Sequence, residues 1–348
     1  MDLSLTDVTA SALANALRDR FTTEREFGRA PLAACCLLVL ALVGLSGSLG
    51  AQAEPPLTPI SKRARATLVI PGSADFLVAD GHAVWATNEG RIERLDVDHP
   101  RPVLTVRIPE PCGAMVVAYG SVWVASCQAA SIYRIDRGSG EVTARIPTGL
   151  ADPQGELSLA AGAGAVWVLS DSQGMLSRVD VARNQVVDRI PVARYSYAAV
   201  FGFGSVWVTN TGAGDAVGAG AVQRIDPGTN KVTATVPVGP QPRFLAAGEG
   251  GVWTLNQGDG SVSRVDPVTN SVAATIAVGV PGSGGDIATG HGRVWVRASK
   301  VLLTTIDPAT NRIIERFGPP AGSGAVRVAD DAVWVTAHDI HTVWVLKF

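Results

Sequence analysis

A Val-Trp pair recurs at seven regularly spaced positions along the chain, and its spacing constrains the fold more than any other feature. The seven pairs end at Trp85, Trp123, Trp167, Trp207, Trp253, Trp295 and Trp334. Successive tryptophans are 38, 44, 40, 46, 42 and 39 residues apart, so seven of the eight tryptophans occupy one repeated position. A period of about 40 residues is the length of a four-stranded propeller blade.

Each repeat contains four short runs of strand-forming residues separated by Gly, Pro, Asn and Asp. In the second repeat these runs are Met115–Ala118, Ser121–Trp123, Ile132–Asp136 and Val142–Ile146. After residue 65 no segment keeps a 3.6-residue apolar period. The sequence therefore predicts an all-β fold, a seven-bladed β-propeller of four-stranded blades, over residues 65–348.

The two ends of the repeat region suggest how the ring is completed. The seventh repeat supplies three strand-like runs before the chain stops, and Ala66–Ile70 precedes the first repeat as an unassigned fourth run. We expect this N-terminal strand to pair with the last repeat and close the last blade, which protects edges that an open array leaves unpaired.

The N-terminal segment has the composition of an export signal. From Ala30 to Ala53 there is no charged residue, and the stretch ends in the small-x-small pattern Ala51-Gln52-Ala53. Residues 1–53 are predicted to be a signal peptide or an N-terminal membrane anchor, because 24 uncharged residues can just span a bilayer. Residues 54–64 are predicted to be a Pro-rich linker. The protein is expected to be exported, periplasmic or extracellular, or anchored to the inner membrane by residues 30–53.

Charge excludes one large class of partner. Lys and Arg total 29 against 31 for Asp and Glu, a formal net charge of −2, and charged residues make up 17% of the chain. There is no basic excess to bind phosphates, so we predict no nucleic-acid partner and no membrane contact outside the N-terminal segment. The propeller is expected to be a monomer whose partner is a protein or a small molecule.

Several repeats resemble a known family. One repeat contains Val208-Thr209-Asn210, followed by Ile225–Val232 and Val236–Gly239, and it looks like the YVTN repeat of exported bacterial propellers, the YncE-like proteins. The motif at Ile225–Val232 occurs again at Ile306–Ile313. The resemblance implies the propeller fold over about residues 65–348. It does not specify the function, because such propellers have many different functions. The leading hypothesis is a noncatalytic protein that binds a protein partner or small ligand on its channel face.

The repeat is also similar to that of virginiamycin B lyase, which implies an alternative enzyme function using a histidine and magnesium. The lyase repeats favour Trp-Phe-Thr-Glu, whereas this chain has Trp-Val-Ala at Trp123 and Trp-Thr-Leu at Trp253. No catalytic residue is assigned from this resemblance. A quinoprotein-like oxidoreductase is a further alternative that rests on shared architecture, and the cofactor stays unknown.

Most conspicuous polar residues have a structural explanation. The repeated aspartates are Asp96, Asp136, Asp180, Asp226, Asp266 and Asp307. Asp at the start of a turn accepts hydrogen bonds from backbone N–H groups, so Asp-Pro-x-Thr-Asn is interpreted as a motif that stabilises a hairpin turn. The tryptophans are interpreted as packing between blades. His338-Asp339-Ile340-His341 could bind a metal, but a solvated loop is favoured and no metal site is predicted.

Two cysteines in the second repeat are predicted to form a disulfide. If Tyr119-Gly120 is a two-residue turn that pairs Ala118 with Ser121, the same register places Cys112 opposite Cys127. Opposed positions bring Cβ atoms about 4.5 to 5.5 Å apart, near disulfide range. Disulfides are typical of exported proteins.

A ligand site is expected where the innermost strands begin, ten or eleven residues before each tryptophan. These positions are Asp75, Cys112, Glu156, Tyr197, Arg243, Gly284 and Ser323. Because their charges are mixed, neither a polyphosphate nor a single cation is specified. The candidate ligand-binding residues are Tyr195, Tyr197, Arg243, Glu156 and Asp75, and the Gly-rich insertion at residues 212–220 is expected to form a loop on the same face.

Overall fold

The computed structural model describes residues 54–99, 101–150, 156–170, 174–212, 219–279, 282 and 284–347. The chain divides into two units at residues 53 and 54, and the described residues all belong to the second, Glu54–Phe348. The predicted export segment therefore lies outside the described residues. Within the described part of the chain, no helix is long and apolar enough to cross a membrane.

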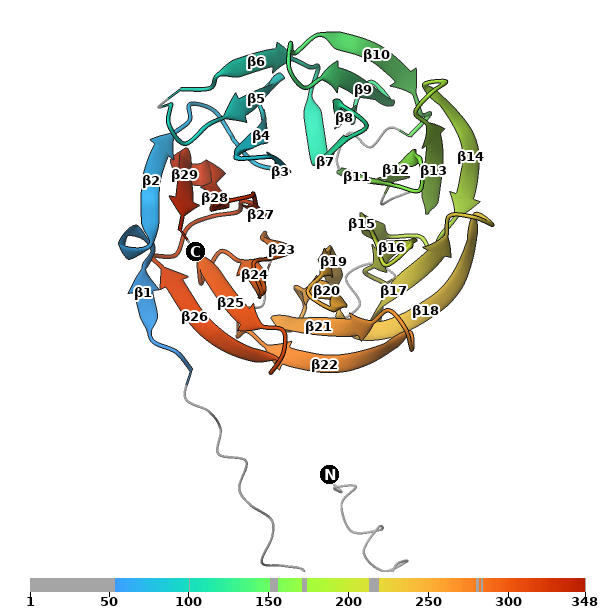
Figure 1. Cartoon of the computed structure of the whole chain (residues 1–348). Helices are drawn as coiled ribbons and strands as arrows, with labels where there is room; N and C mark the ends of the chain where they lie inside the picture. Colours follow the sequence, from blue (N-terminus) through green and yellow to red (C-terminus); the bar gives the residue numbers. More distant parts are fainter. Residues whose placement is uncertain are drawn as a thin grey trace, which may run out of the picture. The chain divides into compact units, whose positions relative to one another are not determined.

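The second unit is a ring of seven β-sheets, as Figure 1 shows, and the predicted all-β seven-bladed propeller is confirmed. In the described residues six sheets have four strands and one has five. We number the blades 1 to 7 along the chain. The innermost strands are β3 (Leu77–Asp80), β7 (Pro111–Ala118), β11 (Leu157–Gly162), β15 (Ser196–Gly202), β19 (Pro242–Gly248), β23 (Asp286–Gly290) and β27 (Val326–Val328).

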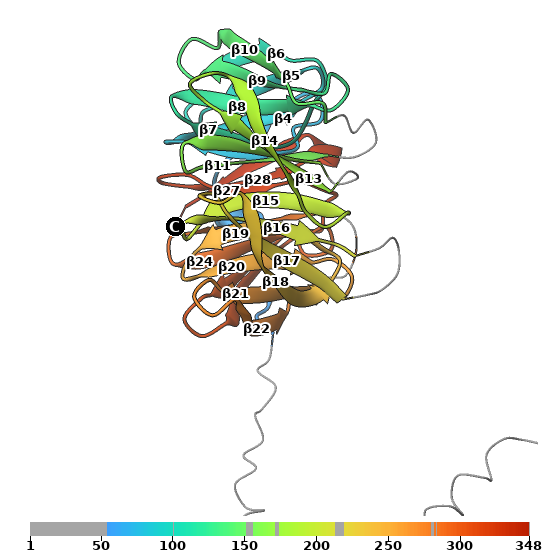
Figure 2. The same ribbon diagram turned by 90° about the vertical axis from the view of Figure 1, so that its right-hand side faces the viewer.

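The other strands follow outward in each blade. The second strands are β4 (Ala83–Asn88), β8 (Ser121–Ser126), β12 (Ala165–Ser170), β16 (Ser205–Asn210), β20 (Gly251–Asn256), β24 (Arg293–Arg297) and β28 (Val333–Ala337). The third strands are β5 (Arg91–Leu95), β9 (Ser131–Asp136), β13 (Met175–Asp180), β17 (Ala219–Asp226), β21 (Ser261–Asp266), β25 (Leu303–Asp307) and β29 (Thr342–Leu346). The outer strands of blades 1 to 6 are β6 (Leu104–Arg107), β10 (Val142–Pro147), β14 (Gln185–Pro191), β18 (Lys231–Pro240), β22 (Ser271–Ala277) and β26 (Arg312–Gly318). Seen from the side, the unit is thinner than it is wide (Figure 2).

The repeated tryptophans lie inside the ring between neighbouring blades. Six of them are fully buried and Trp295 is 4% exposed. Trp167, for example, belongs to a cluster that contains Val206 and Val208 of the next blade. Its indole N–H donates to the Gly162 carbonyl at 3.2 Å, which satisfies the one polar atom that burial removes from water. The structure thus places the tryptophans as packing residues between blades.

An arginine on the third strand links a blade to the outer hairpin of the next. Arg224 lies opposite Trp207 in the register of β16 and β17, with its guanidinium carbon 5.1 Å from the Trp207 ring centroid. Its Nη1 donates to the Pro267 carbonyl and to Asn270 Oδ1, at 2.9 and 3.1 Å. The same contact recurs from Arg134, Arg178 and Arg264 to the next blade. We call it the Arg-Asn clamp.

The repeated aspartates form hydrogen bonds within the outer hairpin turns that contain the asparagines of the Arg-Asn clamp. Asp226 Oδ1 accepts the Gly228 N–H at 2.8 Å and Asp226 Oδ2 accepts the Thr229 hydroxyl at 3.0 Å. Hydrogen bonding to the Gly228 N–H lowers the pKa of this carboxyl. These contacts match the hairpin interpretation of the Asp-Pro-x-Thr-Asn segments.

The residues before the first blade join the ring at two places. Strand β2 (Ala64–Val69) pairs antiparallel with β29, with Thr67 opposite Trp344, and is the outer strand of blade 7. Strand β1 (Leu57–Pro59) pairs parallel with β26 as a fifth strand of blade 6. Between them the short 3₁₀ turn η1 (Ile60–Lys62) buries Ile60, which is 2% exposed. Residues 57–62, expected to belong to a linker, are therefore attached to the propeller by strand pairing and apolar packing.

The predicted disulfide is present, but the register that led to it is wrong at one end. Cys112 and Cys127 are bonded, with their Cα atoms 5.9 Å apart. Ala118 pairs with Ser121 as expected, whereas Cys112 lies opposite Ala125 because the register shifts between Cys112 and Val116. Gly113, with φ +73°, sits in this bulge, and a Cβ there would lie 1.8 Å from the Leu157 carbonyl oxygen of the next blade. The close approach of blade 3 accounts for the irregularity.

Candidate functional site

A cavity of about 620 Å³ lies where the innermost strands begin, at one end of the ring's centre. We call it the axial cavity. Its lining residues are Asp75, Phe76, Glu156, Tyr197, Arg243, Phe244, Gln257, Gly284, Gly285, Asp286, Ser299, Gly322, Ser323, Gly324 and Ala325. Six of the seven strand-start positions chosen from the sequence are among them. The seventh, Cys112, is held in the disulfide-bonded bulge of β7 and does not line the cavity.

Three of the expected residues form one connected group on the side of blades 3 to 5. The Tyr197 hydroxyl donates to Glu156 Oε2 at 2.6 Å. The Arg243 guanidinium carbon lies 4.0 Å from the Tyr197 ring centroid, a cation–π contact, and Phe244 meets the same ring edge-on with centroids 5.8 Å apart. Burial raises the pKa of Glu156, with Asp75 adding to the effect and the Tyr197 hydrogen bond opposing it.

Asp75 stands on the blade 1 side of the cavity. Among the residues that the structure describes, its carboxylate has no hydrogen-bond donor and no ion-pair partner. Burial raises its pKa to about 6, the nearby Asp286 carboxylate adds to the rise, and Arg297 opposes it. A carboxylate in such surroundings is poised to accept a proton or a cationic group from a ligand.

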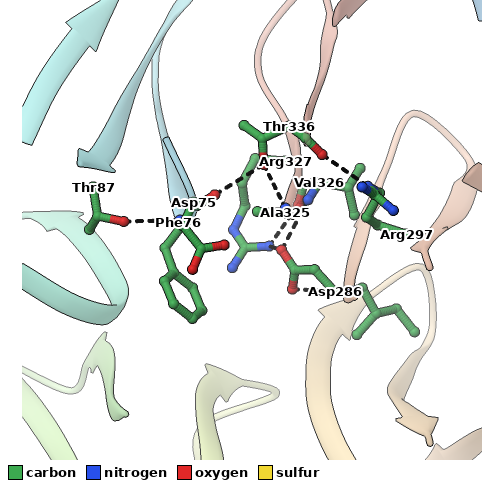
Figure 3. Close-up of polar contacts among 10 residues, drawn as sticks. Asp75, Phe76, Thr87, Asp286, Arg297, Ala325, Val326, Arg327 and Thr336 are labelled. Atoms are coloured by element: carbon green, nitrogen blue, oxygen red, sulfur yellow. Dashed lines mark hydrogen bonds and ion pairs between the residues drawn. The ribbon is translucent and has the colours of Figure 1, made fainter. Parts of the chain in front are cut away.

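Asp286 and Arg327 form a partly buried ion pair between blades 6 and 7 (Figure 3). Asp286 is 4% exposed, and its carboxylate also accepts the N–H groups of Val326 at 3.0 Å and Ile287 at 2.9 Å. Burial nevertheless raises the pKa of Asp286, against the effect of Arg327. The pair joins the first strands of two blades directly beside Asp75.

Arg297 supports the same wall from behind. Its side chain is fully buried, and its guanidinium donates to the carbonyls of Ala298, Gly322 and Thr336, the last at 2.9 Å. The Thr336 hydroxyl in turn donates to the Asp75 carbonyl at 3.1 Å (Figure 3). Burial lowers the pKa of Arg297 to about 10, so it stays charged at neutral pH. Arg297 therefore fixes the loop that holds Gly322 as well as the strand behind Asp75.

Asp286, Arg297 and Arg327 were not among the residues predicted from the sequence, although the sequence carries a signal for each. Relative to the repeated tryptophan of its own blade, Asp286 lies nine residues before it, Arg297 two residues after it and Arg327 seven residues before it. At the corresponding positions of the other six repeats, every residue is uncharged. The charge appears in a single repeat each time, so a search for recurring residues overlooks it.

Other predicted features lie away from the axial cavity. Tyr195 is 42% exposed and is not among the lining residues. Residues 213–218 of the Gly-rich insertion fall outside the described part of the chain. His338–Ile340 forms the short turn η2, in which Asp339 accepts the Gly322 N–H at 2.9 Å. No group of three or more His, Cys, Asp or Glu side chains able to hold a metal ion occurs within the described ranges.

Solved structures with the same fold include a virginiamycin B lyase and a streptogramin B lyase. No protein-family model and no curated protein sequence matches the chain. Virginiamycin B lyase from Staphylococcus aureus aligns at 14% identity and a TM-score of 0.66, covering 81% of this chain and 98% of the lyase. A streptogramin B lyase structure aligns at 17% identity and a TM-score of 0.67, covering 81% and 95%.

A third structure comes from a protein of a different kind. The WD40 domain of Neurospora crassa Pan2 aligns at 14% identity and a TM-score of 0.65, covering 84% of this chain and 97% of the domain. At these identities the likenesses establish the seven-bladed fold. The residues of the axial cavity carry the argument about function.

Proposed function

We propose that this propeller is a noncatalytic binding protein that takes a small polar ligand in its axial cavity. The observation that carries the proposal is a concave site of about 620 Å³ in which opposite charges line different sides. This volume falls within the range of small-molecule sites, which are commonly clefts of several hundred Å³ with a few well-placed polar groups. Tyr197 and Phe244 add aromatic surface to it.

A small ligand fits this site better than a protein surface does. The Asp75 carboxylate, which has no hydrogen-bond donor among the described residues, lies in the cavity, and aromatic and glycine residues form much of the remaining wall. At Gly324 a Cβ would lie 2.1 Å from the Thr336 carbonyl oxygen, so this part of the wall is close-packed and preformed. A preformed site binds without a large ordering cost.

The lyase alternative draws no specific support from this cavity. That function was expected to need a histidine and a carboxylate within reach of each other and of magnesium. The five histidines of the chain all lie in described residues, and none of them lines the axial cavity. The raised pKa values of Asp75 and Glu156 also suit the binding of a charged ligand group.

Family and location belong to the same proposal. Membership among the YncE-like propellers with YVTN repeats is supported by the recurring Ile-Asp-Pro-x-Thr-Asn words, as at Ile306–Asn311. Export is supported by the composition of residues 1–53 and by the Cys112–Cys127 disulfide, since disulfides persist in oxidising compartments. We propose a periplasmic or extracellular location.

A thermal-shift screen of the purified full-length protein against a chemically diverse metabolite library tests the proposal. We expect a hit whose stabilisation disappears in Arg243→Leu and in Glu156→Gln. Arg183→Leu is the matched control, because Arg183 is 72% exposed and pairs with Asp180 in the outer hairpin of blade 3. Hits that shift all variants equally, or a screen without any hit, would contradict binding in the axial cavity.

A further inference from the structure

We infer that the axial cavity takes a zwitterion of the size of a short unblocked peptide, with its ammonium group on Asp75 and its carboxylate on Arg243. The inference rests on the proposed function and specifies the ligand class. It follows from two opposite charges that face one cavity and do not neutralise each other.

The two charges stand on opposite sides of the ring. Asp75 precedes β3 of blade 1, and Arg243 belongs to β19 of blade 5. In a ring of seven, blades 1 and 5 are separated by two blades on one side and by three on the other. No ion pair joins the two side chains in the described part of the chain, and Arg243 is not among the groups that shift the pKa of Asp75. A ligand must therefore extend across the cavity to reach both.

Each charge is available to a ligand. Among the described residues the Asp75 carboxylate has no donor. The Arg243 guanidinium carbon lies over the Tyr197 ring, and among the described residues the guanidinium N–H groups have no hydrogen-bond acceptor. The planar fork of N–H groups suits a carboxylate, to which arginine binds through two parallel hydrogen bonds.

The other charged groups near the cavity are already committed. Glu156 accepts the Tyr197 hydroxyl, and Asp286 is paired with Arg327 and two backbone N–H groups. Arg297 is bonded to three carbonyls. Arg243 also lowers the pKa of Glu156, but among the described residues neither Arg243 nor Asp75 has a side-chain hydrogen bond or ion pair, so these two are the pair left to select a ligand. A free metal cation is disfavoured because no group of three metal-ligating side chains converges within the described residues.

The size of the cavity indicates more than a single amino acid. An extended chain gains about 3.3 to 3.6 Å per residue, so a tripeptide separates its end charges by roughly 10 Å. The polar side chains of Gln257, Ser299 and Ser323 also line the cavity. Such a wall offers donors and acceptors to peptide groups.

Titration calorimetry with pools of unblocked Ala-Xaa-Ala tripeptides tests the inference at pH 7.5. We expect at least one pool to bind the full-length protein, and N-acetylation or C-amidation to weaken binding about tenfold or more, as the loss of one charged contact implies. Asp75→Asn should weaken the unblocked peptide and leave the N-acetyl form unchanged. Arg243→Leu should do the same for the C-amidated form, and Arg183→Leu should change neither.

Two results would overturn the inference. One is binding of the blocked peptides as tightly as the unblocked ones, and the other is no heat from any pool at millimolar peptide. In both cases the metabolite screen decides the proposed function separately: a hit lost in Arg243→Leu and Glu156→Gln keeps small-molecule binding and rejects only the zwitterion.

Discussion

At the scale of single residues, the wall of the axial cavity depends on charges that occur once in seven repeats. Asp286, Arg297 and Arg327 replace uncharged residues of the other blades, and they fix the loops of blades 6 and 7 around Asp75. The repeat pattern could predict which positions face the cavity because those positions recur. It could not predict these three side chains, because each charge occurs in a single repeat.

Arg297→Leu tests the structural part of this account. The substitution leaves the carbonyls of Gly322 and Thr336 without their donor and removes a positive charge that acts on Asp75 and Asp286. We expect a loss of about 3 to 5 kcal/mol in the free energy of unfolding, measured with urea, as for other buried groups that lose one partner. Arg243→Leu is the control and should cost less than about 1 kcal/mol, the size of its cation–π contact. A loss near zero for Arg297→Leu would contradict the account.

The raised pKa of Asp75 predicts how the stability of the fold depends on pH. Its pKa is raised from 3.8 to about 6, so the folded protein holds this proton more tightly than the unfolded chain does. The resulting stabilisation is present below about pH 4 and is lost as the pH rises through about 6. The groups that act on Asp75 are Asp286 and Arg297, and Asp75 acts on Glu156.

We therefore expect Asp75→Asn to be more stable than the wild type at pH 8 by up to about 3 kcal/mol, because one pKa unit corresponds to 1.36 kcal/mol. The difference should shrink towards pH 4. Urea unfolding at a series of pH values measures it. A difference that stays constant between pH 4 and 8 would show that the Asp75 carboxyl is not perturbed.

At the scale of strands and hairpins, the repeated motifs could be predicted well from the sequence. The Val-Trp run, the turn aspartates and the strand starts recur in most blades, so periodicity alone locates them. The register around Cys112 was not predictable in this way, because the bulge at Gly113 depends on the close contact with Leu157 of the next blade. The attachment of β1 to β26 was missed for the same reason, since Leu57–Pro59 belongs to no repeat.

The Arg-Asn clamp gives a test at this scale. Asn270 has φ +54° and accepts Arg224 Nη1, so Asn270→Ala loses a hydrogen bond and strains the backbone. We expect a cost of about 2 kcal/mol for Asn270→Ala and about 1 kcal/mol for Asn270→Gly, which keeps the backbone conformation and loses only the bond. Equal costs for the two variants in urea unfolding would mean that the positive φ carries no strain.

At the scale of the whole propeller, seven similar blades produce one site that is not symmetrical. Six of the blades contribute residues to the axial cavity, with Asp75 from blade 1 facing Arg243 from blade 5 across it. The ring itself follows from the repeat and from the packing of tryptophans between blades. The ligand preference follows from the few positions at which individual blades depart from the repeat.

A crystal structure of the protein grown with the tightest-binding compound from the metabolite and peptide screens tests the central claim most directly. The account predicts ligand density inside the axial cavity, with one polar group of the ligand at the Asp75 carboxylate and another at the Arg243 guanidinium. Density on the opposite face, near the Asp226 and Asp266 hairpins, or along the edge of a blade would contradict it.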